Sequence, residues 1–148
     1  MNLSKVNDAT ILSEYVKRFT ITAGEHLQSS KASADHFRAY FADAKHEKFV
    51  VCFLNGQHQV IETRTMFVGS LTTSAVYPRE VIAAVLDLNS SGIVCAHNHP
   101  SGGISPSSSD RAVTKKLLTA LNSIDVDLLD HIIVGGSEYF SFSDHRLL

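Results

Sequence analysis

The sequence predicts an α/β fold in which a mixed β-sheet is sandwiched by helices, with extra helices at the N-terminal end. Two observations support this prediction. Apolar runs of strand length alternate with stretches of helical periodicity between about residues 49 and 142. Turn sequences join some of the strands directly, which gives antiparallel pairs, whereas strands joined through a helix can pair in parallel.

The first 40 residues are predicted to contain two helices. Apolar residues recur at helical spacing from about residue 8 to residue 20, and Asp8 or Thr10 can cap that helix. Ser33 can cap a second helix that carries aromatic residues on its apolar side. Three histidines scattered among the polar residues here are expected at the surface: His26, His36 and His46.

The first two strands are predicted to form a hairpin. Residues 49–54 are continuously apolar and end at Asn55-Gly56, which is typical of a central strand that enters a tight turn. Residues 60–68 are rich in β-formers and carry Glu62 and Arg64 on one face. The return strand should therefore have one solvated side.

The remaining elements follow in the order helix, strand, helix, strand, strand. Pro78 suits the first turn of a helix, and its buried stripe is expected to be Val81, Ile82, Val85 and Leu86. An apolar strand at 93–96 comes next, followed by a helix at 108–122. A strand at 128–134 and a short strand at 139–142, joined by two glycines, complete the sheet.

Composition sets limits on the partners. A chain of 148 residues, 44% hydrophobic, can form one domain around a single core. The net charge of −2 does not indicate nucleic acid binding. Cys52 and Cys95 lie in apolar runs, which suits free thiols in a reducing cytoplasm. We expect no membrane partner, because the chain has neither a signal-peptide core nor a spanning apolar run; homo-oligomerisation stays open.

The segment that carries the chemistry begins at the end of the strand at 93–96. His97 and His99 are two residues apart, so on a strand their rings face the same side. The polar, glycine-rich loop that follows leads to Asp110 in the first turn of the next helix. Two nitrogens and one oxygen can thus converge, and three protein ligands with an open fourth position are typical of a catalytic zinc site.

Each of these residues also has a purely structural interpretation. The histidines could hydrogen-bond to the backbone near the strand end. Ser107 and Asp110 are three residues apart before an apolar helix, which is a capping-box pattern. Any one of these residues alone would favour the structural interpretation, whereas their combination favours the metal site.

The combined motif resembles that of a known family. His-x-His-Pro followed at the observed spacing by Ser-x-x-Asp resembles the JAMM signature of the MPN (JAB) metallohydrolases. The form His97-Asn98-His99-Pro100-Ser101-Gly102, with Tyr77-Pro78-Arg79-Glu80 before it and Asp130-His131 after it, resembles the bacterial RadC family over about residues 40–148. The resemblance implies an MPN fold at residues 41–148, with residues 1–40 as a helical extension packed on it.

The resemblance also implies roles for the site residues. His97, His99 and Asp110 would bind one Zn²⁺ per chain, and Ser107 would help to stabilise an oxyanion. The catalytic base would be Glu47, just before the first central strand. Its rival is Glu80, which could instead serve only the dipole of its helix. For His131, a partner of the metal ligands and a packed core residue remain equal alternatives.

Three functions follow as hypotheses. The first is a zinc-dependent hydrolase that cleaves amide or peptide bonds in an unknown protein or peptide substrate by means of a metal-activated water. The second is a DNA-repair-associated factor of the RadC type, which the charge does not favour; the chain also lacks the helix-hairpin-helix region of longer relatives. The third is a non-catalytic MPN interaction module, which normally lacks some JAMM ligands.

Overall fold

The central strands of the sheet divide their side chains between two apolar layers. We describe a computed structural model in which residues 5–71 and 76–148 are placed. Strand β1 (Lys48–Leu54) and strand β3 (Gly92–Asn98) are almost wholly buried. Their odd-numbered residues face one layer and their even-numbered residues face the other. The expectation of a single core is therefore wrong, because a sheet with helices on both faces separates its core into two.

The sheet is mixed, as the sequence predicts. Its strand order is β2-β1-β3-β4-β5, where β2 is Val60–Val68, β4 is Asp127–Gly135 and β5 is Glu138–Ser141. The β1–β2, β1–β3 and β4–β5 pairs are antiparallel, and β3 pairs with β4 in parallel. The parallel pair is joined by a helix, as such crossovers require. The predicted hairpins and the predicted fold class are thus confirmed.

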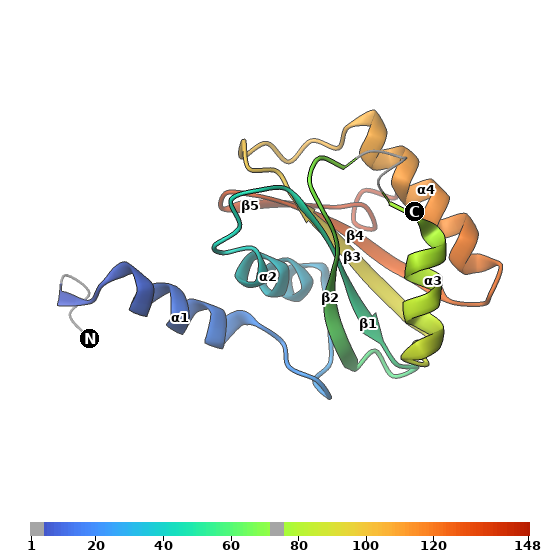
Figure 1. Cartoon of the computed structure of the whole chain (residues 1–148), viewed down its shortest axis with the longest axis horizontal. Helices are drawn as coiled ribbons and strands as arrows, with labels where there is room; N and C mark the ends of the chain where they lie inside the picture. The colour runs from blue at the N-terminus through green and yellow to red at the C-terminus, as the bar shows by residue number, and fades with distance from the viewer. Residues whose placement is uncertain (1–4, 72–75) are drawn as a thin grey trace.

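Helices cover both faces of this sheet. Helix α3 (Pro78–Asp87) and helix α4 (Ser108–Asn122) pack on one face, and helix α2 (Ser30–Tyr40) packs on the other (Figure 1). The apolar stripe of α3 is only partly as predicted, because Val81 and Val85 are buried but Leu86 is 67% exposed. Within the described residues, no helix has the length and apolarity needed to cross a membrane.

The first helix begins at residue 8, as predicted, but the caps of both N-terminal helices differ from the predicted residues. Helix α1 (Asp8–Phe19) is capped by Asn7, whose side chain accepts a hydrogen bond from the Thr10 amide. Ser29, rather than Ser33, caps α2 in the same way. Asn and Ser are equally good caps, so local sequence alone could not choose between neighbouring candidates. Helix α1 has no buried residue and extends away from the sheet in Figure 1.

His36 is the exception among the histidines expected at the surface. His26 and His46 are exposed, whereas His36 is fully buried between α2 and β2. Its Nδ1 accepts a hydrogen bond from the Ile21 amide at 2.8 Å, and its Nε2 lies 3.0 Å from the Thr63 hydroxyl. Burial lowers the pKa of His36 to about 4. The prediction was wrong because both partners come from distant segments of the chain.

His36 should make the stability of the fold depend on pH. The unfolded chain takes up a proton on His36 near pH 6.5, whereas the folded chain stays neutral there until about pH 4. The unfolded state therefore binds more protons in this window, and the free energy of unfolding should fall as the pH falls through it. Between about pH 7 and about pH 4.5 we expect His36 to account for a loss of about 2 to 3 kcal/mol.

Urea unfolding of the wild type and of His36→Asn at both pH values checks this prediction. Asparagine keeps an acceptor for the Ile21 amide but does not titrate. The wild type should lose more stability than the variant. Equal losses in the two proteins would show that His36 is not responsible.

Candidate metal centre

The side chains of His97, His99 and Asp110 meet at one end of the sheet. The Nε2 atoms of His97 and His99 are 2.9 Å apart. Asp110 places Oδ1 at 3.1 Å from His97 Nε2 and Oδ2 at 3.4 Å from His99 Nε2. His97 and Asp110 are buried, and His99 keeps 18% of its side chain exposed. The structure therefore brings together the three residues that the sequence selects as metal ligands.

Strand pairing explains why the two rings face the same point. Strand β3 ends at Asn98, but the His99 amide still donates to the Val134 carbonyl of β4 at 2.8 Å. His99 thus continues the ladder for one more residue, and it shares a face with His97. That face is the one on which α3 and α4 pack, because His97 follows Ile93 and Cys95 at alternate positions. The first turn of α4 lies over the same face.

The first turn of α4 is closed by the predicted capping box. The Asp110 amide donates to Ser107 Oγ at 3.0 Å, and the Ser107 amide donates to Asp110 Oδ2 at 2.8 Å. Burial opposes ionisation of Asp110, but the hydrogen bond and charge of a protonated His97 and the hydrogen bonds from Ser107 outweigh it, so the pKa of Asp110 is lowered. One carboxylate therefore caps the helix and contacts both histidines.

The spacing of these atoms suits a small tetrahedral cation. Bonds of about 2.0 to 2.1 Å in tetrahedral geometry place ligand atoms about 3.3 to 3.4 Å apart. The two histidine nitrogens are 2.9 Å apart, somewhat closer than this, and each faces its own Asp110 oxygen, Oδ1 at 3.1 Å from His97 and Oδ2 at 3.4 Å from His99. Two imidazole nitrogens and a carboxylate oxygen are also a donor set that Zn²⁺ accepts. The residues present therefore fit a bound metal ion.

Glu47 approaches the same histidines from the start of β1. Its carboxylate and the ring nitrogens of His97 and His99 form a group in which the ligand atoms all lie within 4.8 Å of one another. Two sets thus share the histidine pair, one completed by Asp110 and one by Glu47. The Asp110 set is the tighter one and is tied to a helix cap, whereas Glu47 is only half-buried and better placed to contact a bound molecule.

Asn98 fixes the backbone on both sides of Glu47. Its Oδ1 accepts from the Lys48 amide at 2.7 Å, and its Nδ2 donates to the His46 carbonyl at 3.1 Å. The sequence gives no signal for this contact, because its two partners lie about fifty residues earlier in the chain. Glu80, the rival base, has 64% of its side chain exposed and lies 3.9 Å from Arg79.

His131 and Thr114 form a second layer of contacts behind His97. His131 Nε2 lies 2.8 Å from His97 Nδ1, and His131 Nδ1 lies 2.6 Å from Thr114 Oγ1. Burial, and then the charge of His97, hold the pKa of His131 well below its ordinary value. Thr114 was not selected from the sequence, although its position one helical turn after Asp110 places it on the same face of α4.

The hydrogen bonds of the neighbouring Asp130 go to the His131 backbone and to the C-terminal segment. Asp130 accepts hydrogen bonds from the His131 amide at 2.7 Å, from the Ser141 hydroxyl at 2.6 Å and from the Ser143 amide at 2.9 Å. Asp130 therefore joins the C-terminal segment to β4. The Asp-His pair in the sequence thus contains one residue of the site and one of the scaffold.

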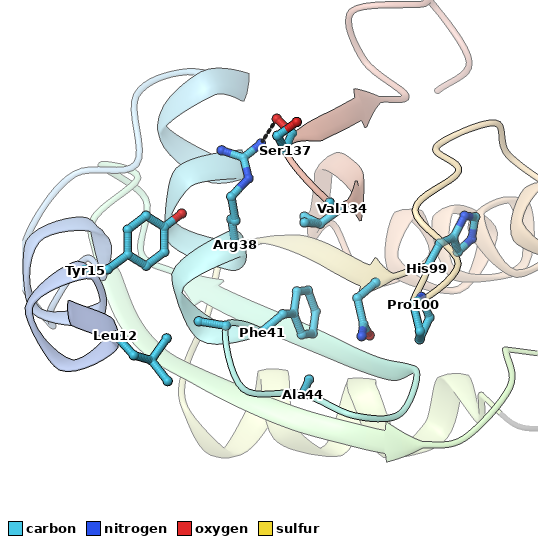
Figure 2. Close-up of a pocket in the computed structure, with 12 residues that line it drawn as sticks. Leu12, Tyr15, Arg38, Phe41, Ala44, His99, Pro100, Val134 and Ser137 are labelled. Carbon is cyan, nitrogen blue, oxygen red and sulfur yellow. Dashed lines mark hydrogen bonds between the residues drawn. The ribbon is translucent and has the colours of Figure 1, made fainter. Parts of the chain in front are cut away.

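A pocket of about 580 Å³ opens beside His99. Figure 2 shows His99 and Pro100 at one end, Leu12 and Tyr15 of α1 at the other, and between them Arg38 of α2 and Phe41, which follows that helix. Arg38 donates to the Ser137 carbonyl at 3.1 Å and pairs with Asp35 at 3.2 Å, so its charge is partly neutralised. The pocket lies on the α2 face of the sheet, is lined by both polar and apolar residues, and borders the candidate metal centre only at Asn98, His99 and Pro100.

This mixed sheet, with helices on both faces and a His-x-His strand end against a helix N-terminus, is the architecture of an MPN (JAB)-like domain. The comparisons identify the branch. The RadC-like JAB domain family matches residues 27–147, and the chain belongs to that family.

The curated relatives agree with this assignment. UPF0758 protein YfjY of Escherichia coli (strain K12) is 38% identical over 140 residues, which cover 90% of this chain and 88% of that protein. UPF0758 protein YeeS of the same organism is 42% identical over 125 residues, 84% of each chain. A UPF0758 protein of Shewanella loihica is 37% identical over 141 residues, which cover 95% of this chain and 63% of the longer relative.

The loop that orients His99 depends on a glycine in β4. His99 Nδ1 lies 2.7 Å from the Gly103 carbonyl. A Cβ on Gly135 would lie 2.6 Å from the Gly102 carbonyl oxygen and 2.8 Å from that of Gly103, which is too close for real Cβ contacts. We expect Gly135→Ala to displace this loop, to cost about 1 to 3 kcal/mol of stability through overpacking, and to weaken divalent metal binding.

Thermal unfolding of the metal-free protein and chelator competition with Zn²⁺ measure these two effects. Gly103→Ala is the matched control, because a Cβ there meets no atom within 4 Å. If Gly135→Ala and Gly103→Ala behave alike in both measurements, the close approach does not hold the loop in place.

Proposed function

We propose that this RadC-like JAB domain is a zinc-dependent hydrolase that cleaves amide or peptide bonds in a protein or peptide substrate. The observation that carries the proposal is the mutual approach of His97 Nε2, His99 Nε2 and the Asp110 carboxylate. Three such ligands leave a fourth position open for a water or substrate atom. Closed structural zinc sites instead use four protein ligands, often cysteine, and both cysteines here are buried and free.

When bound, a zinc ion would lower the pKa of a coordinated water to about 7 and polarise the substrate carbonyl. The residues of the chain supply the rest. Glu47 takes a proton from the attacking water and passes it to the amide nitrogen that leaves. Ser107 is exposed at the start of α4, and its hydroxyl would turn from the Asp110 cap to donate to the oxyanion that develops on the carbonyl.

The half-buried Glu47 and the partly exposed His99 mark the side from which a peptide substrate would reach the site. We propose the cytoplasm as the location, because the buried thiols Cys52 and Cys95 need no oxidising compartment.

Metal content tests the ligand assignment. We expect one zinc ion per chain in protein purified without added metal, and none in His97→Ala or Asp110→Ala, because each removes a ligand from the three. Elemental analysis provides the measurement, with Glu80→Gln as the control that keeps its metal. Metal content that is unchanged in both ligand variants would refute the site.

Removal of the metal should also destabilise the fold, because the ligands join β3 to α4. A ligand at about a hundred times its dissociation constant stabilises the folded state by about 2.7 kcal/mol. Chelation should therefore lower the thermal midpoint of the wild type. The same treatment should leave the midpoint of His97→Ala unchanged.

Glu47→Gln tests the catalytic role. The amide keeps the size of the side chain but cannot accept the proton, so the fold and the metal should be retained while the rate falls by a factor of about 10² to 10⁴. Cleavage of a complex peptide mixture, followed by mass spectrometry of new termini, measures the rate without an identified substrate. Glu80→Gln should cleave like the wild type, and the opposite order of the two variants would assign the base to Glu80.

A further inference from the structure

The contacts behind His97 form one continuous chain of hydrogen bonds. The chain starts at the Asp110 carbonyl, which accepts from Thr114 Oγ1 at 2.7 Å. It continues through Thr114 Oγ1 to His131 Nδ1 at 2.6 Å and from His131 Nε2 to His97 Nδ1 at 2.8 Å. Thr114, His131 and His97 are all buried, so water does not compete for these bonds.

The chemistry of the groups fixes the direction of every bond in this chain. A carbonyl only accepts, so the single proton of the Thr114 hydroxyl points to Asp110. The Thr114 oxygen must then accept from His131, which places the proton of His131 on Nδ1. A fully buried imidazole packed against aromatic rings is neutral and has one N–H. His131 Nε2 is therefore an acceptor, and His97 must donate from its own Nδ1.

We infer that His131 and Thr114 are positioning residues that keep the proton of His97 on Nδ1, so that Nε2 presents its lone pair to a metal ion. His99 reaches the same state independently, because its Nδ1 lies 2.7 Å from the Gly103 carbonyl, which can only accept. Both nitrogens that face Asp110 are then ready to coordinate. The inference rests on the proposed function only for the identity of the ion.

His97 needs this control because Asp110 favours the opposite tautomer. A carboxylate oxygen at 3.1 Å from His97 Nε2 attracts a proton to that nitrogen, where it would block coordination. The chain through His131 opposes this attraction by offering a buried acceptor on the other side of the ring. Contacts of this kind determine the tautomer of a metal-binding histidine. Their removal commonly lowers the metal affinity by about 10- to 100-fold.

Thr114→Val provides the sharpest test, because it removes the hydroxyl without touching either histidine. The His131 Nδ1–H loses its acceptor, so the proton is expected to move to His131 Nε2 and the proton of His97 to move to its own Nε2. Long-range ¹H–¹⁵N correlation spectra of the metal-free, histidine-labelled protein at about pH 8, above the ordinary histidine pKa of about 6.5, report which nitrogen of His97 is protonated. Zn²⁺ affinity, measured by chelator competition, should fall about 10- to 100-fold.

Two variants control for merely structural effects. Thr114→Ser keeps the hydroxyl and should retain the wild-type tautomer and affinity. Thr119→Val removes an equivalent hydroxyl bond on α4, from Thr119 Oγ1 to the Lys115 carbonyl, at an exposed position. It should change neither measurement.

The wild-type spectrum alone can overturn the inference. A His97 whose Nδ1 lacks the proton in the wild type contradicts it, even if Thr114→Val fails to fold and even if the protein proves to be a hydrolase. An unchanged tautomer and affinity in a folded Thr114→Val also contradict it. Conversely, zinc binding with the expected tautomers but without hydrolysis would remove the proposed function and leave this inference in place.

Discussion

The candidate site depends on the double use of the Asp110 carboxylate. One oxygen accepts from the Ser107 amide and completes the cap of α4, and the carboxylate also contacts both histidines at the end of β3. The start of the helix is thus tied to the end of the strand through a single side chain. Because the cap restrains the carboxylate, the site does not rely on a flexible side chain to bring its third ligand into place.

The rings of His97 and His99 are oriented in the same way. Each ring uses Nδ1 for a hydrogen bond to the protein, His97 to His131 and His99 to the Gly103 carbonyl, and each turns Nε2 toward Asp110. In the tautomers inferred above, the two Nε2 lone pairs and the carboxylate would repel one another, and a cation at their centre would relieve that repulsion.

Local patterns predicted most of the elements because periodicity and turn chemistry act over a few residues. The hairpin of β1 and β2, the helix after Pro78 and the whole of α4 agree with the sequence prediction. The errors concern choices that local patterns do not determine. At α1 and α2 the capping residue is a near neighbour of the predicted one. Leu86 continues the apolar stripe of α3 in the sequence, but the sheet does not cover it.

The sequence by itself determined the strand, loop and helix that carry His97, His99 and Asp110, because residues close in the chain share a face or a cap by backbone geometry alone. It did not determine which distant residues contact this segment. The approach of Glu47 depends on the pairing of β1 with β3, and the contacts of His36 and His131 depend on segments far away in the chain. Only tertiary structure decides such contacts, because burial and hydrogen-bond partners arise from packing between distant segments, and no local period encodes them.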